Sequence, residues 1–277
     1  MTATFAPAAP HPAGSATAGP RSALGVSFRG LGRSFGEGTA RRTVLRDIDF
    51  DVVPGELVAI LGPSGCGKST LLRAVAGLDA PSAGEVLIDG TAVEGIDGRC
   101  AVAFQEPRLM PWQSVRRNVA LGLPHGTGKA EGDARVDELI DLVELGAHAS
   151  HRPREISGGM AQRASLARAL ARRPGVLLLD EPFGALDALT RLKMQDLLLE
   201  VRRVAPATVL LVTHDVDEAL QLADRILVLG RTPDREGATI SEVLTVPGER
   251  PRDRASAELA RMRSALLESL GVDSHRH

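Results

Sequence analysis

The sequence has 277 residues, enough for about two domains, and its 43% hydrophobic and 25% charged residues exclude a wholly disordered chain. The 33 basic residues nearly balance the 35 acidic residues, so the net charge of −2 gives no general attraction to nucleic acid. Two cysteines are too few for a disulfide framework and indicate a reducing compartment.

The start of the chain is rich in alanine, proline, threonine and glycine and contains no apolar block. We expect residues 1–22 to form a disordered tail, because they cannot bury enough apolar surface to fold. The segment is typical of neither a signal peptide nor a transit peptide. No later apolar run approaches the roughly 20 residues of a membrane helix, so we expect a soluble intracellular protein.

The chain from 23 to 104 predicts strands and one helix. Short strands are expected at 23–35 and 43–53, and the unbroken apolar run Leu57–Leu61 is typical of a strand covered on both faces of a parallel sheet. A helix is expected over Ser69–Ala76. Two more strands are predicted at Glu85–Ile88 and Cys100–Phe104.

From about residue 107 to residue 173 the strand pattern disappears, and apolar residues at helical spacing predict a helical subdomain within the unit 23–249. Its last helix is expected over Ser157–Ala171. Strands and helices then alternate, which predicts an α/β core with a parallel sheet. Residues 250–277 are charged, with leucines at helical spacing, and predict a C-terminal helical tail. The alternating elements are the strands Val176–Leu179, Val209–Val212 and Ile226–Leu229 and the helices Arg191–Val204 and Asp215–Ala223.

A glycine-rich segment between the strand Leu57–Leu61 and its helix matches the phosphate-binding loop, or P-loop. Glycines let backbone N–H groups turn toward a polyphosphate, and the helix N-terminus adds partial positive charge. Lys68 is expected to reach the β- and γ-phosphates, and the Ser69 hydroxyl to bind Mg²⁺. Cys66 is interpreted as a small filler of the loop rather than a redox group. The segment, which predicts a nucleotide-binding site, is Gly62, Pro63, Ser64, Gly65, Cys66, Gly67, Lys68, Ser69 and Thr70.

Two carboxylates follow the apolar strand Val176–Leu179. A buried strand delivers Asp180 to its carboxyl end, where α/β sheets place ligands, and there Asp180 can hold the Mg²⁺ shell. Glu181, one residue further on, is free to take a proton from an attacking water. The two acids beside a P-loop predict a nucleotide hydrolase.

A second glycine pair lies just before this acidic strand, in the segment Ile156–Arg163, and it resembles the signature sequence of ABC ATPases. The family sequence reads LSGGQ or LSGGM followed by Gln-Arg, and Ile156 stands in place of the leucine. The resemblance spans about residues 26–229. It implies a P-loop NTPase, RecA-like core with an antiparallel β subdomain and a helical ABC-specific subdomain. It also implies signature residues that contact the ATP of a partner subunit, namely Ser157, Gly158, Gly159, Met160 and Gln162.

Four further residues take roles from the same resemblance. Gln105 is similar to the Q-loop glutamine, which contacts Mg²⁺ and the attacking water, and Asp187 to the D-loop residue that crosses a dimer interface. His214 resembles the switch histidine at the γ-phosphate. Phe35 fits the aromatic position that stacks on adenine, with a core role beside Phe28 as the alternative.

Within the family, the segments 104–112 and 186–191 resemble the nitrate/sulfonate/taurine importer branch, and the segment 194–200 is most similar to aliphatic-sulfonate importers. The resemblance implies an ATP- and Mg²⁺-dependent homodimer, peripheral at the cytoplasmic face of the cell membrane. Its partners would be two integral membrane permease subunits and, indirectly, a periplasmic or lipoprotein-type solute-binding protein, but no nucleic acid. Leu109, Met110 and Trp112 would either contact the permease or belong to the core of the helical subdomain.

Alternative functions are an importer or exporter of another solute, an ABC ATPase acting on nucleic acid, and a non-catalytic scaffold. The nucleic-acid class normally carries a long coiled-coil insert between the P-loop and the signature, and the interval from Lys68 to Ser157 has no room for one. A scaffold is disfavoured because Glu181 and His214 are both present.

Overall fold

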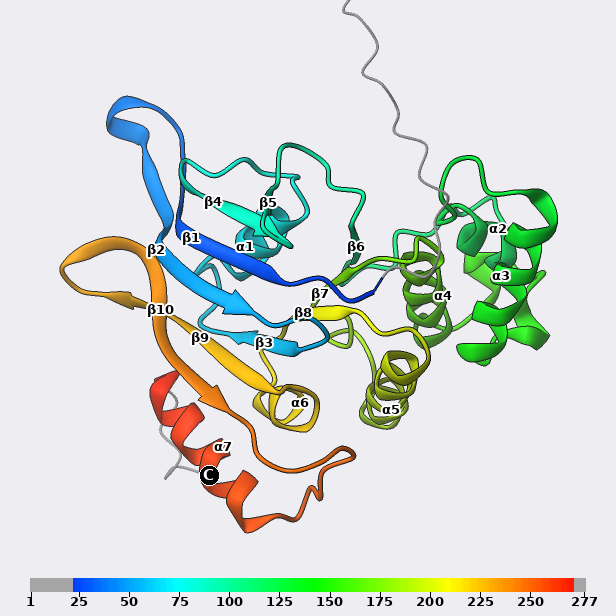
Figure 1. Ribbon diagram of the computed structural model, residues 1–277. Helices are drawn as coiled ribbons and strands as arrows, with labels where there is room; N and C mark the ends of the chain where they lie inside the picture. Colours follow the sequence, from blue (N-terminus) through cyan, green and yellow to red (C-terminus); the bar gives the residue numbers. More distant parts are fainter. Residues whose placement is uncertain (1–21, 272–277) are drawn as a thin grey trace, which may run out of the picture.

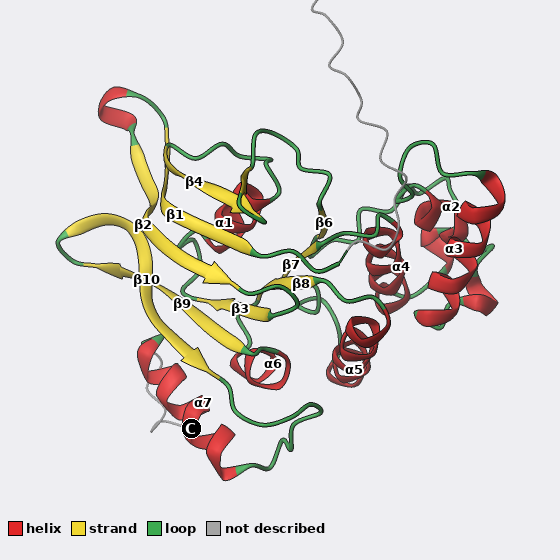
Figure 2. Cartoon of the chain, in the orientation of Figure 1, coloured by secondary structure: helices red, strands yellow, loops and turns green. Residues whose placement is uncertain are grey.

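The computed structural model describes residues 22–271, so the predicted tail at 1–22 lies outside the described residues except for Ser22. The described strands form one ten-stranded sheet in the order β5-β4-β1-β2-β10-β9-β3-β8-β7-β6 (Figures 1 and 2). They are β1 (Val26–Phe35), β2 (Arg42–Val52), β3 (Leu57–Leu61), β4 (Ala83–Ile88), β5 (Thr91–Ala92), β6 (Cys100–Ala103), β7 (Val176–Asp180), β8 (Thr208–Val212), β9 (Arg225–Thr232) and β10 (Arg235–Thr245).

The helices lie on both faces of this sheet and at one end of it (Figure 1). Three short 3₁₀ turns, η1 (Gly38–Ala40), η2 (Gly146–His148) and η3 (Pro153–Glu155), lie in loops. The α-helices are α1 (Lys68–Val75), α2 (Val115–Ala120), α3 (Lys129–Leu142), α4 (Gly158–Ala171), α5 (Ala188–Val204), α6 (Val216–Leu222) and α7 (Ala257–Ser269).

One half of the sheet is the parallel core. β3 pairs in parallel with β8 and β9, and β7 pairs in parallel with β8 and β6. Every residue of β3 is buried because its side chains enter two hydrophobic clusters alternately. Leu57, Ala59 and Leu61 pack among the helices that follow β6, whereas Val58 and Ile60 pack on the side of α1. This confirms the two-sided burial expected from the apolar run.

The other half consists of antiparallel strands. β1 pairs with β2 and β4, and β9 pairs with β10 along the whole length of β10. The register between β10 and β2 is the single parallel pair Ala238 and Leu45, and this pair joins β5, β4, β1 and β2 to the other six strands of the sheet. The predicted α/β fold class with an antiparallel β portion is confirmed, while the strand β10 was not predicted.

Helices α2, α3 and α4 lie together between β6 and β7 in the chain (Figure 1). They pack through apolar residues of one hydrophobic cluster, such as Val119, Leu139 and Leu170. The predicted helix over 157–171 is confirmed as α4. No helix within residues 22–271 is long and apolar enough to cross a membrane.

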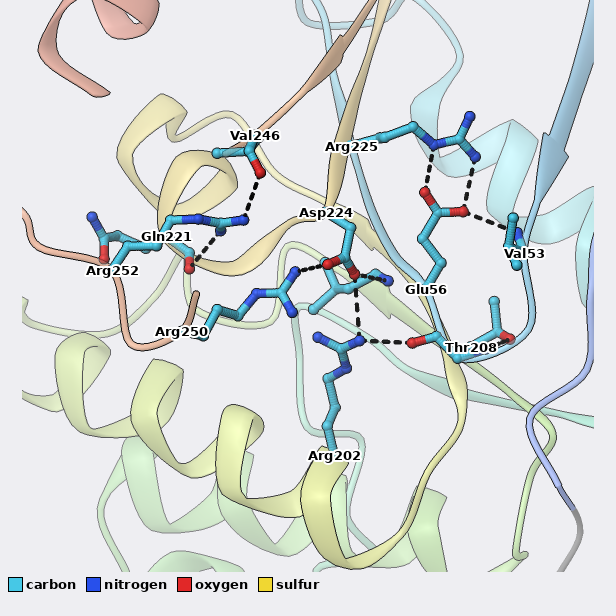
Figure 3. Close-up of polar contacts among 12 residues, drawn as sticks. Val53, Glu56, Arg202, Thr208, Gln221, Asp224, Arg225, Val246, Arg250 and Arg252 are labelled. Atoms are coloured by element: carbon cyan, nitrogen blue, oxygen red, sulfur yellow. Dashed lines mark hydrogen bonds and ion pairs between the residues drawn. The ribbon is translucent and has the colours of Figure 1, made fainter. Parts of the chain in front are cut away.

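The C-terminal helix α7 reaches α6 through the segment 246–256. Arg252 is only 8% exposed and donates to the carbonyls of Leu220 and Gln221 in the last turn of α6, and to those of Val246 and Pro247. Figure 3 shows the bonds to Gln221 and Val246.

Asp224 anchors the same segment to the sheet. Its carboxylate contacts Arg250 and Arg202 and accepts a bond from the Leu57 N–H at 2.8 Å (Figure 3). The segment that leads to α7 is therefore fixed to the core by ionic as well as backbone contacts.

Candidate nucleotide-binding site

The P-loop occupies the turn between β3 and α1, and two of its glycines are required by the geometry. Gly62 has φ +153°, and a Cβ there would lie 2.6 Å from the Leu229 carbonyl oxygen. Gly67, the residue before α1, has φ +108°, which L side chains rarely adopt. Cys66 is buried beneath Gly62, and burial raises the pKa of its thiol, consistent with a loop filler.

Lys68 begins α1 and extends back over the P-loop. Its Nζ donates to the carbonyls of Gly62 at 2.8 Å and Pro63 at 3.2 Å, and the residue is only 7% exposed. The ammonium is therefore held at the loop that would surround a polyphosphate.

Ser69 faces the acidic end of β7. Its hydroxyl donates to Oδ1 of Asp180 at 2.9 Å. Burial is the main cause that raises the pKa of Asp180, and the neighbouring charge of Glu181 adds to it. The sheet thus brings together the two oxygen ligands that the sequence predicted.

Glu181 points to a different neighbour. Its backbone has φ +47°, and its N–H donates to the carbonyl of Val212 in β8 at 2.9 Å. Its Oε2 lies 3.3 Å from Nδ1 of His214, whose side chain is exposed. A Cβ on Gly184 would lie 3.5 Å from Nε2 of Gln105 and 3.7 Å from Cε1 of His214. Gln105, Glu181 and His214 therefore meet around one turn.

An open cleft of about 640 Å³ runs along the P-loop, a size that suits a small-molecule ligand. Phe35 lines it and is 42% exposed, so this ring is not a core residue. The Arg33 guanidinium lies 4.4 Å from the Phe35 ring centroid. The P-loop and acidic residues that line the cleft are Ser64, Gly65, Gly67, Lys68, Ser69, Thr70 and Glu181.

Sequence reasoning missed two residues of this cleft, Arg42 and Val44. They belong to β2, and Arg42 is the register partner of Phe35 in β1. Pairing of the two predicted strands near their glycine-rich turn was the only available signal for them.

The signature residues lie elsewhere, at the start of α4. Ser157 is the N-cap of this helix, and its hydroxyl accepts from the Met160 N–H at 3.3 Å. Ser157 and Gly158 are exposed, whereas Gly159 is buried against α5, where a Cβ would lie 2.5 Å from Cγ2 of Thr190. None of them lines the cleft of the same chain, within the residues that the structure describes.

Gln162 has a position different from that of Ser157. It is only 4% exposed, and its Nε2 donates to the Phe104 carbonyl at 3.0 Å. The side chain thus faces inward and links α4 to the residue before Gln105. Asp187 is exposed and caps α5, and the hydrogen bonds from Thr190 lower the pKa of its carboxyl group.

The oxygen groups of the site fit magnesium. No group of three or more His, Cys, Asp and Glu side chains within residues 22–271 could hold a metal. Mg²⁺ in nucleotide sites usually takes one or two carboxylates, and substrate phosphates and water complete its shell. The Ser69 hydroxyl and the Asp180 carboxylate supply hard oxygen ligands of this kind.

A P-loop next to an acidic strand end, at the carboxyl ends of a parallel sheet, defines a P-loop NTPase. The family model described as ABC transporter matches residues 45–184. The chain belongs to the ABC transporter family and is an ATPase of the ABC type.

The curated relatives include two proteins that align with almost the whole chain. An aliphatic sulfonates import ATP-binding protein, SsuB 1, of Streptomyces avermitilis is 52% identical over 260 residues, which are 94% of this chain and 91% of the relative. A protein of the same name from Xanthomonas axonopodis pv. citri is 47% identical over 253 residues, 90% of this chain and 97% of the relative.

Solved structures agree with the fold. The ATP-binding cassette MJ0796, solved as a dimer in a post-hydrolysis state with ADP and Pi, is 31% identical with a TM-score of 0.69 and covers 81% of this chain and 100% of its own. The cbiO1 protein of Clostridium perfringens has a TM-score of 0.72 at 24% identity, covers 91% of this chain and 98% of its own, and supports the fold alone.

Proposed function

We propose that the chain is the ATP-hydrolysing subunit of an importer for aliphatic sulfonates. The observation that carries this proposal is the identity of 52% and 47% to two proteins named for sulfonate import, across at least 90% of this chain. The proposed assembly is a homodimer beneath two permease subunits at the cytoplasmic face of the membrane, with a periplasmic or lipoprotein-type solute-binding protein that delivers the solute.

ATP would lie along the cleft, with adenine on Phe35 and the phosphates on the P-loop and Lys68. Support comes from the position of these groups along one surface. Ser69, Asp180 and Gln105 would hold Mg²⁺, which supplies positive charge where phosphoryl charge spreads in the transition state.

Hydrolysis needs a group that takes a proton from water, and Glu181 is proposed for this role. His214 would orient Glu181 and contact the γ-phosphate. The distance of 3.3 Å between His214 Nδ1 and Glu181 Oε2 supports the pairing. The same turn holds Gln105 near both residues.

The signature residues Ser157, Gly158, Gly159 and Met160 are proposed to complete the site of a second copy. The exposed helix start at Ser157, which lies outside the chain's own cleft, supports this arrangement, as does the dimeric state of MJ0796. The D-loop residue Asp187 would lie at the same interface. ATP binding would close the two copies, and hydrolysis would release them.

The permease is proposed to contact the segment after Gln105. Trp112 is 67% exposed and Met110 is 38% exposed, whereas Leu109 packs against the core. Two exposed apolar side chains so close together favour a protein contact.

The test uses the chain with the permease and solute-binding protein encoded in its own organism, expressed in a host that lacks sulfonate uptake. We expect uptake of labelled ethanesulfonate by the assembly and its loss with Glu181→Gln. Uptake of nitrate, or of taurine alone among the sulfonates tested, without uptake of ethanesulfonate would contradict the proposed solute. Recovery of the chain with nucleic acid instead of the permease would contradict the importer assignment.

A further inference from the structure

Arg191 in the first turn of α5 connects two segments of the site that are far apart in sequence. Its Nη2 donates to the carbonyl of Leu186, next to Asp187, at 3.4 Å. Its Nη1 lies 2.9 Å from Oδ2 of Asp215, the residue after His214. The guanidinium therefore touches the D-loop backbone and the residue adjoining the switch histidine.

A second carboxylate strengthens this connection. Glu218 in α6 is 3% exposed, and its Oε1 lies 3.7 Å from Nε of Arg191. Its Oε2 accepts the Thr213 hydroxyl proton at 2.6 Å, and the Thr213 Oγ1 accepts from the Asp215 N–H at 3.0 Å. Both residues that flank His214 are thus held by groups that contact Arg191.

The His214 side chain has little support of its own. It is exposed, and its ring nitrogen Nδ1 contacts Glu181. The place of the imidazole therefore depends on the contact with Glu181 and on its own backbone, which the flanking residues Thr213 and Asp215 hold.

We propose that Arg191 is a positioning residue for ATP hydrolysis, which transmits the position of the D-loop at Leu186 to the backbone of His214. This inference rests on the proposed function, because it requires His214 to act at the γ-phosphate. It adds a physical route by which a partner copy at the D-loop changes the geometry of the site.

Arginine suits this place because its planar fork donates to several acceptors in fixed directions. Lysine would keep the charge but offer one mobile ammonium. A neutral side chain would leave Asp215 and Glu218 facing each other without the cation between them, so the backbone around His214 would lose its fixed position.

The experiment measures ATP turnover of the full chain with Arg191→Met and Arg191→Lys. We expect Arg191→Met to lower kcat by about 10- to 100-fold, the usual effect of misplacing a reacting group by an ångström. The KM for ATP should change less than threefold, because Arg191 is not among the residues that line the nucleotide cleft. Arg191→Lys should recover part of the lost kcat.

The matched control is Arg263→Met, which breaks another ion pair to α6, the contact of Arg263 with Asp217 at 3.0 Å. It should leave kcat within twofold. If Arg191→Met does not fold, Asp215→Asn gives a second test, because it removes the ion pair with Arg191 and keeps an oxygen that caps α6.

A double variant distinguishes the two proposals. If Arg191 acts through His214, then Arg191→Met with His214→Ala should turn over no more slowly than His214→Ala alone. A full additional loss, or a kcat of Arg191→Met within twofold of the unchanged chain, would overturn the inference and leave the proposed function intact. A normal kcat for His214→Ala would instead overturn the proposed role of His214.

Discussion

One backbone angle directs the neighbouring acids Asp180 and Glu181 to different partners. A non-glycine residue at φ +47° costs of order 1–3 kcal/mol, which its surroundings must offset. The bond from the Glu181 N–H to Val212 holds this turn at the end of β7. As a result Asp180 contacts Ser69, while Glu181 turns toward His214.

Replacing Glu181 with glutamine tests the division of roles. The amide keeps the shape but cannot accept a proton, so we expect turnover to fall by about 10²- to 10⁴-fold. The affinity for a fluorescent ATP analogue should stay unchanged. The control is Glu200→Gln on the exposed side of α5, which should behave as the unchanged chain. Normal turnover of Glu181→Gln would remove this residue from the proposed role.

Glu218 predicts a pH dependence of stability. Burial raises the pKa of its carboxyl group to about 7, above its ordinary value of 4.5 in the unfolded chain. The folded state thus binds the proton more tightly, so its stability falls as the pH rises from 4.5 to 7, by about 1.4 kcal/mol per pH unit and about 3 kcal/mol in all. Asp215, Arg191 and His214 are the charged or titratable neighbours that act on this group.

Urea unfolding at pH 5 and pH 8 measures this effect. Relative to the unchanged chain, Glu218→Gln should gain stability at pH 8 compared with pH 5, because glutamine cannot ionise. As a control, Glu258→Gln, at an exposed position on α7, should change the free energy of unfolding by the same amount at pH 5 and at pH 8. If Glu218→Gln also changed the free energy of unfolding equally at both pH values, the raised pKa of Glu218 would be refuted.

Helix α6 ends against the side chain of Arg252, which is remote in sequence. The last carbonyls of a helix lack partners within the helix. Arg252 donates to two of them, those of Leu220 and Gln221, and burial lowers the pKa of its guanidinium to about 10, so it stays charged at neutral pH.

Arg252→Met should therefore lower the free energy of unfolding by about 2–4 kcal/mol, since it leaves buried carbonyls without donors. Thermal and urea unfolding provide the measurement. Arg254→Met is the matched control, because Arg254 is exposed and bonds one amide oxygen, that of Gln195. Equal losses for the two variants would show that burial of Arg252 adds nothing.

The sequence predicted best those elements whose own residues form a recognisable pattern. The strands β3, β7 and β8 are continuous apolar runs, and the P-loop has a fixed spacing, so both could be predicted. β10 could not, because polarity does not follow burial along it: Glu242 is half-buried whereas Val243 is exposed, and the strand is held by pairing with β9. The turn at Pro233 and Asp234 was the one local sign of that hairpin.

Residues that act through tertiary contacts could not be predicted from the sequence either. Arg42 joins the cleft only because β1 and β2 pair, and Arg191 meets Asp215 only after α5 and α6 pack. Arg42 lies in no motif, and the segment 186–191 indicates a branch of the family without indicating the contact that Arg191 makes. The placement of the P-loop and of the two acids that follow β7 was therefore predictable, but the tertiary contacts that support them were not.

The proposed dimer can be tested with two substitutions that each inactivate a different part of the site. Lys68→Ala is expected to disable the P-loop of its chain, and Ser157→Arg to block the signature of its chain. If each site combines the P-loop of one copy with the signature of the other, a dimer with the two defects on different chains keeps one intact site. A dimer with both defects on one chain keeps none.

We expect the dimer with the defects on different chains to hydrolyse ATP measurably faster than the dimer with both on one chain. Phosphate release from tandem-purified mixed dimers measures the difference. Both carry the same two substitutions, so each is the control for the other. The opposite order would show that each chain completes its own site.

The single register pair between Ala238 and Leu45 makes a seam through the middle of the sheet. Phe35 and Arg42 lie on one side of it, while Lys68 and the rest of the P-loop follow β3 on the other. A nucleotide in the cleft would cross this seam, with its base on the side of Phe35 and its phosphates on the side of the P-loop, and would hold the two parts of the sheet together. Tripolyphosphate has no base and would contact only the P-loop side of the seam. Amide exchange at the seam that is slower with a nucleotide than with tripolyphosphate would therefore show that the base is bound.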